Sequence, residues 1–409
     1  MRRFLSALLT IAICLGISNP ARGQTEIQIA DPEVTYTFGG MLTIETEINS
    51  EVSIQRVLVL LQPAGETENV AAVATFTPPN QVTYSLDLSQ NPFPVFTDVY
   101  YTFQVELENG ETITSEKFKF DYDDDRFPWQ SLQTEEFEVY WYEGDTEFGQ
   151  TILNTAYEGL ARLQNQVNVP NPDKVTFYVY ASTQDLQSTL QMSGQAAAWI
   201  AGHANPAAGV VLVSIPPGPA QSIEIKRQVP HELTHVMLYL KLGEDYDKLP
   251  NWLHEGLAST TEVFPNPDYP LLLEKAYERE MLIPIANLCQ SFPVDAANFQ
   301  LAYAESTSFT WYLLGEFGNP GMENLIEAYA DGVGCDRGVE LALESSLAGL
   351  ERDWRRLNFN ESPLRSSTEG IIPWVIVFVT MLLPTFGLFV GDTIKHRRKN
   401  EKLQNAKGD

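Results

Sequence analysis

The chain has 409 residues, with 26 Lys and Arg against 54 Asp and Glu, which gives a formal net charge of −28 at pH 7. So large an acidic excess argues against binding to nucleic acid or to anionic lipid by electrostatic attraction. Acidity of this kind favours cationic substrates or simply keeps a protein soluble.

Residues 1–23 predict a secretory signal. Arg2 and Arg3 are followed by an apolar stretch from Phe4 to Ile17 and by the small-x-small sequence Ala21-Arg22-Gly23. A transmembrane segment is the alternative, but the stretch is short and its flank is polar. Outside this segment the cysteines are Cys289 and Cys335. In an exported domain they form a disulfide or remain two free thiols.

Residues 24–122 predict an all-β domain. Apolar and polar residues alternate in short runs, and Asn109-Gly110 marks a hairpin between the strands Tyr101–Leu107 and Thr112–Phe120. The pattern is typical of an immunoglobulin-like or fibronectin-like sandwich, a module that positions a neighbouring domain or binds a protein partner. Residues 123–136 begin with acidic side chains and predict a solvated linker.

Residues 137–359 predict an α+β domain. We expect strands at Phe137–Tyr142 and Val175–Tyr180 and an edge strand near Gly209–Ser214. The expected helices are Thr146–Val167, one beginning at Ser182, Gln221–Leu242, Leu272–Met281, Tyr303–Phe317, Met322–Tyr329 and Val339–Leu357.

The sequence His231-Glu232-Leu233-Thr234-His235 predicts a metal site in this domain. Two histidines four residues apart share one face of a helix, so both imidazoles can reach one ion. Glu232 is then placed to take a proton from a water molecule activated by the metal. A carboxylate from a second helix, Glu255, would complete a His/His/Glu set and leave a fourth position open, as catalytic zinc sites require.

The alternative is an exposed helix with two unrelated histidines. Two observations oppose it: the chain has only five histidines, and Val236–Leu240 is an almost wholly apolar run. A helix buried on more than one side needs partners for its polar groups. Pro230 begins the helix in its first turn or kinks a longer one; either leaves His231 and His235 in the same relation.

The motif and the later segment Leu249-Pro250-Asn251-Trp252-Leu253-His254-Glu255-Gly256-Leu257-Ala258 resemble the gluzincin metallopeptidases. They resemble more closely the bacterial peptidase MA-like domains, with their LPxWLxEGLA pattern. The resemblance implies a thermolysin-like fold, a bacterial source and Zn²⁺ held by His231, His235 and Glu255. It also implies that Glu232 is the general base.

Three more residues have two interpretations each, and a fourth, His254, has one. Glu262, seven residues after Glu255, returns to the same helix face and supports a zinc-bound histidine, or it is an exposed glutamate. Tyr303 stabilises the oxyanion by the same resemblance, or it is an ordinary core or surface tyrosine. His203 lines the cleft or is a loop histidine, and His254 is expected to point to a different side of its helix from Glu255.

The C-terminal region predicts a membrane anchor. Residues 360–370 form a polar stalk, and residues 371–390 are long and apolar enough for a transmembrane helix. Residues 391–409 are rich in Lys and Arg, which marks a cytoplasmic tail. The expected location is the cell membrane, with a single span and the bulk of the chain outside the cytoplasm.

Together these features predict a membrane-anchored, extracytoplasmic zinc metallopeptidase that acts on peptides or proteins. No GxMEN-type amine-anchoring motif precedes the metal-binding helix, which favours an endopeptidase over an aminopeptidase. The alternative function is a non-catalytic, membrane-tethered, zinc-containing binding or scaffold protein.

Overall fold

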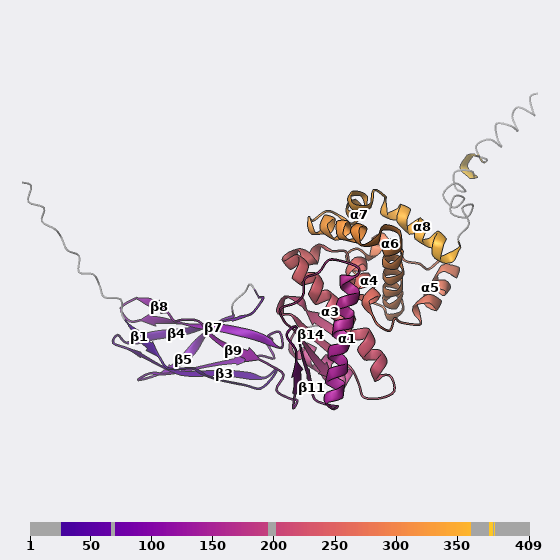
Figure 1. Ribbon diagram of the computed structural model, residues 1–409. Coiled ribbons are helices and arrows are strands. Elements are labelled where there is room, and N and C mark those ends of the chain that lie inside the picture. The colour runs from indigo at the N-terminus through magenta and orange to yellow at the C-terminus, as the bar shows by residue number, and fades with distance from the viewer. Residues whose placement is uncertain (1–25, 67–69, 195–201, 361–375, 379, 381–409) are drawn as a thin grey trace, which may run out of the picture. The chain divides into compact units, whose positions relative to one another are not determined.

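The computed structural model describes residues 26–66, 70–194, 202–360, 376–378 and 380 (Figure 1). The predicted signal at 1–23, the tail at 391–409, and all but a few residues of the predicted stalk and membrane helix lie outside these ranges. Within the described ranges, no helix is long and apolar enough to span a membrane. The described residues divide into two compact units: residues 26–126 together with 192–194, and residues 127–191 together with those from 202 onwards.

The first unit contains nine strands, and every pairing among them is antiparallel. Their hydrogen-bonded order is β1-β3-β6-β5-β4-β7-β8, with β2 paired to β3 and β9 paired to β7. They are β1 Ile27–Ile29, β2 Glu33–Tyr36, β3 Met41–Ser50, β4 Ile54–Pro63, β5 Val70–Thr77, β6 Gln81–Asp87, β7 Thr97–Leu107, β8 Thr112–Thr114 and β9 Phe118–Tyr122.

Alternation along these strands builds the core of the unit. Every second residue of β7 is buried from Thr97 to Leu107, as the period of two predicts. The predicted hairpin at Asn109-Gly110 is confirmed, because β8 pairs with β7 and Gly110 has a φ of 82°. The strand predicted at Thr112–Phe120 is in fact two strands, β8 and β9, both of which pair with β7.

The second unit is built on a five-stranded sheet in the order β10-β11-β12-β14-β13. The three central strands are parallel, and the two edge strands run antiparallel to their neighbours. The strands are β10 Gln130–Gln133, β11 Phe137–Trp141, β12 Val175–Tyr180, β13 Gly202–Asn205 and β14 Val210–Ser214.

Two features of this sheet differ from the sequence prediction. β10 lies inside the segment 123–136 that was predicted as a linker. It was missed because its sequence is short and mostly polar, without the apolar alternation that predicts a strand. The predicted edge strand corresponds to β14, which is fully buried and lies between β12 and β13. The actual edge strand is β13, which carries His203.

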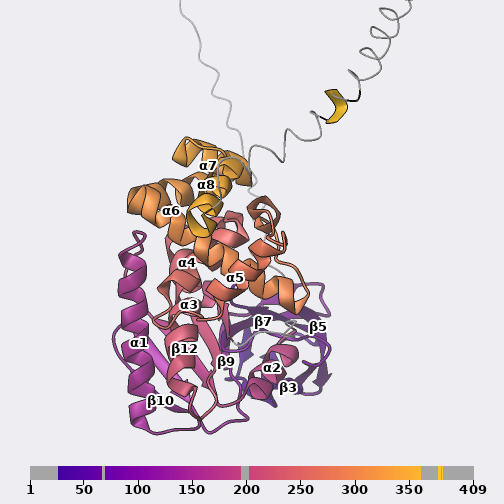
Figure 2. The same cartoon turned by 90° about the vertical axis from the view of Figure 1, so that its right-hand side faces the viewer.

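Eight helices accompany the sheet in the described part of the second unit. They are α1 Thr146–Gln164, α2 Thr183–Met192, α3 Gln221–Leu242, α4 Asn251–Thr261, α5 Tyr269–Glu278, α6 Ala296–Ala330, α7 Cys335–Leu343 and α8 Leu347–Phe359. α1 and α3 lie side by side (Figure 2), and one continuous apolar cluster runs from Phe137 in β11 to Trp354 in α8.

Two helix boundaries were set by local backbone geometry that the apolar periodicity does not reveal. The helices predicted at 303–317 and 322–329 belong to α6, which is interrupted at Gly318 with a φ of 60° and a ψ of −168°. The helix predicted at 339–357 is divided into α7 and α8, because Glu344 is left-handed and the Ser346 side chain caps α8 by accepting from Gly349 N.

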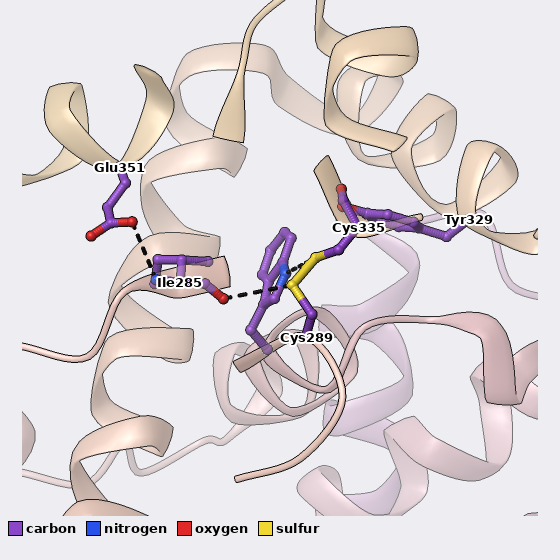
Figure 3. The surroundings of a disulfide bond; sticks show 6 residues. Ile285, Cys289, Tyr329, Cys335 and Glu351 are labelled. Atoms are coloured by element: carbon purple, nitrogen blue, oxygen red, sulfur yellow. Dashed lines mark hydrogen bonds between the residues drawn. A yellow bond between two sulfur atoms is a disulfide. The ribbon is translucent and has the colours of Figure 1, made fainter. Parts of the chain in front are cut away.

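Cys289 and Cys335 form a disulfide (Figure 3). The bond lies beside the first turn of α4: Asn251 N donates to the Cys289 carbonyl at 3.0 Å, and Trp252 Nε1 lies 3.5 Å from Cys335 Sγ. The Tyr329 hydroxyl donates to the Cys335 carbonyl at 2.8 Å. The disulfide therefore connects the end of the 3₁₀ helix Ile285–Leu288 with the beginning of α7, beside the start of α4.

Candidate metal centre and active site

Helix α3 carries both histidines of the motif. It runs without interruption for 22 residues, with Ile225, Val229, Leu233 and Val236 buried. Two placements were predicted for Pro230: the first turn of a helix or the interior of a longer one. The structure shows the second, with Pro230 inside α3. The imidazole rings of His231 and His235 are 5.2 Å apart between centroids, on one face.

Helix α4 brings Glu255 against these two rings. Glu255 Oε2 lies 3.3 Å from His231 Nε2 and 3.7 Å from His235 Nε2, and one ligand atom from each of the three residues lies within 4.8 Å of the others. Bonds of 2.0–2.1 Å to a tetrahedral zinc ion place ligand atoms about 3.4 Å apart. The three side chains, each 10–16% exposed, therefore fit a small tetrahedral ion as they stand.

Gly256 allows α4 to approach α6 closely. A Cβ atom at this position would collide with the Thr310 hydroxyl and would lie 2.6 Å from the Ser306 carbonyl oxygen. This close contact fixes the position of α4 relative to α6. Tyr303 is also in α6, so α4 is held beside it. A glycine directly after the third ligand thus has a packing role.

Each histidine has a partner for its second ring nitrogen. His231 Nδ1 lies 3.2 Å from Glu262 Oε1, and His235 Nδ1 lies 3.0 Å from the Tyr246 hydroxyl in the 3₁₀ helix Gly243–Lys248. Such partners fix the ring orientation and direct the other nitrogen, Nε2, towards a metal. No sequence pattern pointed to Tyr246, because its spacing of eleven residues from His235 crosses the end of α3.

Glu262 reaches His231 by a route different from the predicted one. α4 ends at Thr261, so Glu262 does not continue the helical face of Glu255. The absence of an N–H on Pro230 leaves the Lys226 carbonyl without its helical donor. That carbonyl accepts instead from Val263 N at 2.8 Å and from Phe264 N at 3.3 Å. The proline thereby anchors the segment that carries Glu262 beside α3.

Burial and neighbouring charges shift the pKa values of the ligands. Burial lowers the pKa of His235 to about 3, so this imidazole is neutral and free to bind a metal. Burial also opposes the charged form of Glu255, but the adjacent imidazoles outweigh it and hold the Glu255 pKa well below its usual range. Glu255 and Glu262 together outweigh burial at His231 and raise its pKa.

Glu232 lies against the edge strand β13. A Cβ atom on Gly202 would collide with the Glu232 carboxylate, so glycine at this position lets the strand pass this close without displacing that side chain. Burial, reinforced by Glu255 and Glu262, raises the pKa of Glu232 to about 7, although His231 acts in the opposite direction. A carboxyl group with such a pKa can both accept and return a proton near neutral pH.

A cavity of about 570 Å³ opens over these groups. Its described lining comes from β13, α3, α4, the 3₁₀ helix and the start of α6, and includes Gly202, His203, Ala204, Pro206, Glu232, His235, Tyr246, His254, Glu255, Asn266, Tyr269, Val294, Ala296, Phe299, Gln300 and Tyr303. His203 therefore lines the cleft. His254 also lines it, which corrects the prediction that it points away from the side of Glu255.

Tyr303, in α6, also lines the cavity. Its ring is 6.0 Å from that of His231, and its hydroxyl forms a hydrogen bond with Glu255. Burial, followed by the charges of Glu255 and Glu232, raises the pKa of Tyr303 well above its usual value. The hydroxyl therefore keeps its proton and can act as a donor in the cavity.

Residues 155–360, half of the chain, match the model of the Peptidase MA superfamily. The chain belongs to this superfamily, as the resemblance of its motifs indicated. No curated protein matches the chain significantly.

Three solved structures illustrate the likenesses found. The M1 zinc metallopeptidase from Deinococcus radiodurans is 12% identical, with 81% of this chain and 92% of that chain covered and a TM-score of 0.33. OgpA from Akkermansia muciniphila is 14% identical over 25% and 28% of the two chains, with a TM-score of 0.22. A family 56 carbohydrate-binding module that binds β-1,3-glucan is 13% identical over 23% and 98%, with a TM-score of 0.17. With TM-scores this low, these likenesses carry no argument.

Proposed function

We propose that this protein is a zinc metallopeptidase that hydrolyses internal peptide bonds of peptide or protein substrates. The observation that carries the proposal is the convergence of His231, His235 and Glu255 around one point, with Glu232 in the same cavity. Membership of the Peptidase MA superfamily supports it.

His231, His235 and Glu255 would hold the ion, and their side chains are oriented for this by Glu262 and Tyr246. A zinc ion bound there supplies Lewis-acid activation of water and of the scissile carbonyl group. Three protein ligands leave room for substrate, as catalytic rather than structural zinc sites do.

Glu232 would move the proton. Its carboxylate takes a proton from the attacking water and later transfers it to the leaving amine, a cycle for which a pKa near neutrality is suited. Tyr303 would act next, since its protonated hydroxyl faces the cavity and can donate to the oxyanion that develops at the scissile carbonyl.

The polar groups of the cavity favour an endopeptidase. Among the described residues that line it, the carboxylates are Glu232 and Glu255, and there is no lysine or arginine. Both carboxylates are assigned to the metal and to proton transfer, which leaves no acid to bind a substrate's free amino terminus. No cation among these residues binds a free carboxyl terminus. The interior of a substrate's peptide chain carries neither terminal charge, so it matches this lining.

The test uses internally quenched peptides with both termini blocked, incubated with the purified protein loaded with zinc. We expect cleavage that a chelator stops and that zinc restores. Glu232→Gln should keep one equivalent of zinc and lose cleavage by about 10³-fold or more, because the proton acceptor is gone. Cleavage by Glu232→Gln at the wild-type rate would overturn the mechanism. Stoichiometric zinc with no cleavage of any library would favour the scaffold alternative.

We also propose that the protein is exported and anchored in the membrane by residues 371–390, with the peptidase outside the cytoplasm. The support is the sequence of residues 1–23, 371–390 and 391–409. A protease added to intact cells should remove the peptidase unit and leave a short membrane-associated fragment. Recovery of intact protein in the soluble cytoplasmic fraction would contradict this.

A further inference from the structure

His254 is a buried cavity residue to which the proposed function assigns no role. Its side chain is 16% exposed, and Nδ1 is inaccessible to solvent and has no hydrogen-bond partner among the described residues. The other nitrogen, Nε2, is held by the Asn251 side chain at 3.2 Å. A buried polar atom without a partner is costly unless another state of the protein provides one.

The two carboxylate oxygens of Glu255 face different groups. Oε2 faces the Nε2 atoms of His231 and His235 at 3.3 and 3.7 Å. Oε1 lies on the other side, 3.6 Å from His254 Nδ1, a few tenths of an ångström beyond hydrogen-bond distance.

The surrounding side chains limit the rotation of His254. Its ring is 5.5 Å from the ring of His235 and 5.8 Å from that of Tyr246. Asn251, in the same helix, fixes the remaining nitrogen. A neutral imidazole meets both contacts if the Asn251 amide donates to Nε2, because Nδ1 then carries the proton. The two ends of an asparagine amide are interchangeable in shape, so this assignment needs no rearrangement.

We propose that His254 is a positioning residue for the third ligand: Nδ1–H donates to Glu255 Oε1 and holds the carboxylate with only Oε2 directed at the metal. The inference rests on the proposed zinc site, and it assigns no proton transfer to His254. Without this bond the Tyr303 hydroxyl is, among the described residues, the remaining partner of the carboxylate outside the metal site, so the carboxylate turns more freely and metal affinity falls.

Two substitutions separate the two nitrogens of His254. His254→Asn places an amide nitrogen close to the position of Nδ1, whereas His254→Gln places one close to Nε2. Zinc affinity is measured for each variant by competition with a chelating dye. We expect the Gln variant to bind zinc about tenfold or more weakly, as losses of such outer partners do. The Asn variant should stay within about threefold of wild type.

His203→Ala is the matched control for zinc affinity, because His203 lines the same cavity from β13, whereas the partners of the Glu255 carboxylate among the described residues are His231, His235, His254 and Tyr303. Its zinc affinity should equal that of wild type. Cobalt(II) substituted for zinc gives a second readout: its visible absorption should change in the Gln variant and stay unchanged in the Asn variant.

Unchanged zinc affinity in the Gln variant would overturn the proposal. Restoration by Gln but not by Asn would also overturn it, because the Asn251 contact would then be the important one. If the affinities follow the expected order and no variant, nor the wild type, cleaves peptides, the positioning role stands and the proposed peptidase function fails.

Discussion

The cavity has two sides that differ in how they are built. The ligand side consists of α3 and α4, where His231, Glu232, His235 and Glu255 lie on two regular helices packed against each other. The facing side consists of β13, the 3₁₀ helix and the segment 294–303, which contribute His203, Tyr246, Phe299 and Tyr303. The difference teaches that the proposed ion site is defined mainly by regular helical geometry, while the proposed substrate site depends on segments brought together by the tertiary fold.

The largest effect on the facing side is expected from Tyr303→Phe. It removes a donor to the oxyanion, and loss of one such donor lowers kcat by about 10²–10³-fold. Because the Tyr303 hydroxyl also bonds to Glu255, zinc binding should weaken as well, so kcat is compared at saturating zinc. Steady-state kinetics on blocked peptides, with the zinc content measured in parallel, separate the two quantities. If kcat is unchanged, Tyr303 has no part in the chemistry.

Tyr246→Phe tests whether the two sides are independent. Tyr246 belongs to the facing side, yet its hydroxyl is the partner of a ligand, His235 Nδ1, at 3.0 Å. We expect zinc to bind about 10–100-fold more weakly, as losses of such partners do. Glu262→Gln, which alters the partner of His231, is the matched variant on the ligand side. A loss of similar size in both variants would show that the facing side also stabilises the ion.

Gly202→Ala should have a smaller effect. A methyl group at position 202 meets the Glu232 carboxylate, and the flexible end of that side chain, or strand β13 itself, must shift. A displacement of the base by a fraction of an ångström lowers kcat by about tenfold, while the ion is untouched. Gly209→Ala is the control for strain, because Gly209 is left-handed with a φ of 65° but lies outside the described cavity lining. Equal activity of Gly202→Ala and wild type would mean that β13 does not confine Glu232.

These differences explain what could be predicted from the sequence. The convergence of His231, His235 and Glu255 could be predicted, because four residues make one helical turn and the Glu255 segment is itself a recognisable pattern. The contact of Glu262 was expected for a different reason: a helix that in fact ends at Thr261. The anchoring of the following residues by the Lys226 carbonyl depends on Pro230, thirty-three residues before Val263, and no local pattern encodes it.

No sequence pattern comparable to the histidine motif predicted the residues on the facing side. Tyr246 lies in a 3₁₀ turn, and no apolar period continues through it from α3. For His203 the sequence left open a cleft position or a loop histidine, and the structure places it in β13 at the cavity. The edge was assigned to β14, because a run of buried valines gives no information on which neighbour a strand has. His254 was placed on the wrong side because adjacent residues on a helix are about 100° apart, an angle narrow enough for both to border one wide cavity.

The smallest effect on the cavity is expected from a substitution of Glu305, which lies in α6 just after Tyr303 in the sequence. Glu305 is fully buried, and Oε1 accepts from Ile283 N at 2.9 Å, while Oε2 has no hydrogen-bond partner among the described residues. Burial raises its pKa to about 8, with Glu351 acting in the same direction and Arg355 against it. The carboxyl group is therefore protonated in the folded protein at neutral pH.

The sign of the pH dependence follows from this shift. The folded-state pKa lies above the unfolded value, so the contribution of Glu305 to stability is complete below about pH 4.5 and is lost as the pH rises to about 8. Glu305→Gln keeps the acceptor for Ile283 N and does not titrate. The free energy of unfolding of this variant relative to wild type should therefore rise between pH 5 and pH 8, by an amount on the order of 3 kcal/mol. Urea unfolding at several pH values measures it, with the same substitution at the exposed Glu274 as the control variant. If the difference in free energy of unfolding between Glu305→Gln and wild type stays constant over this pH range, Glu305 is ionised throughout. With either result, the zinc affinity of this variant should match that of wild type.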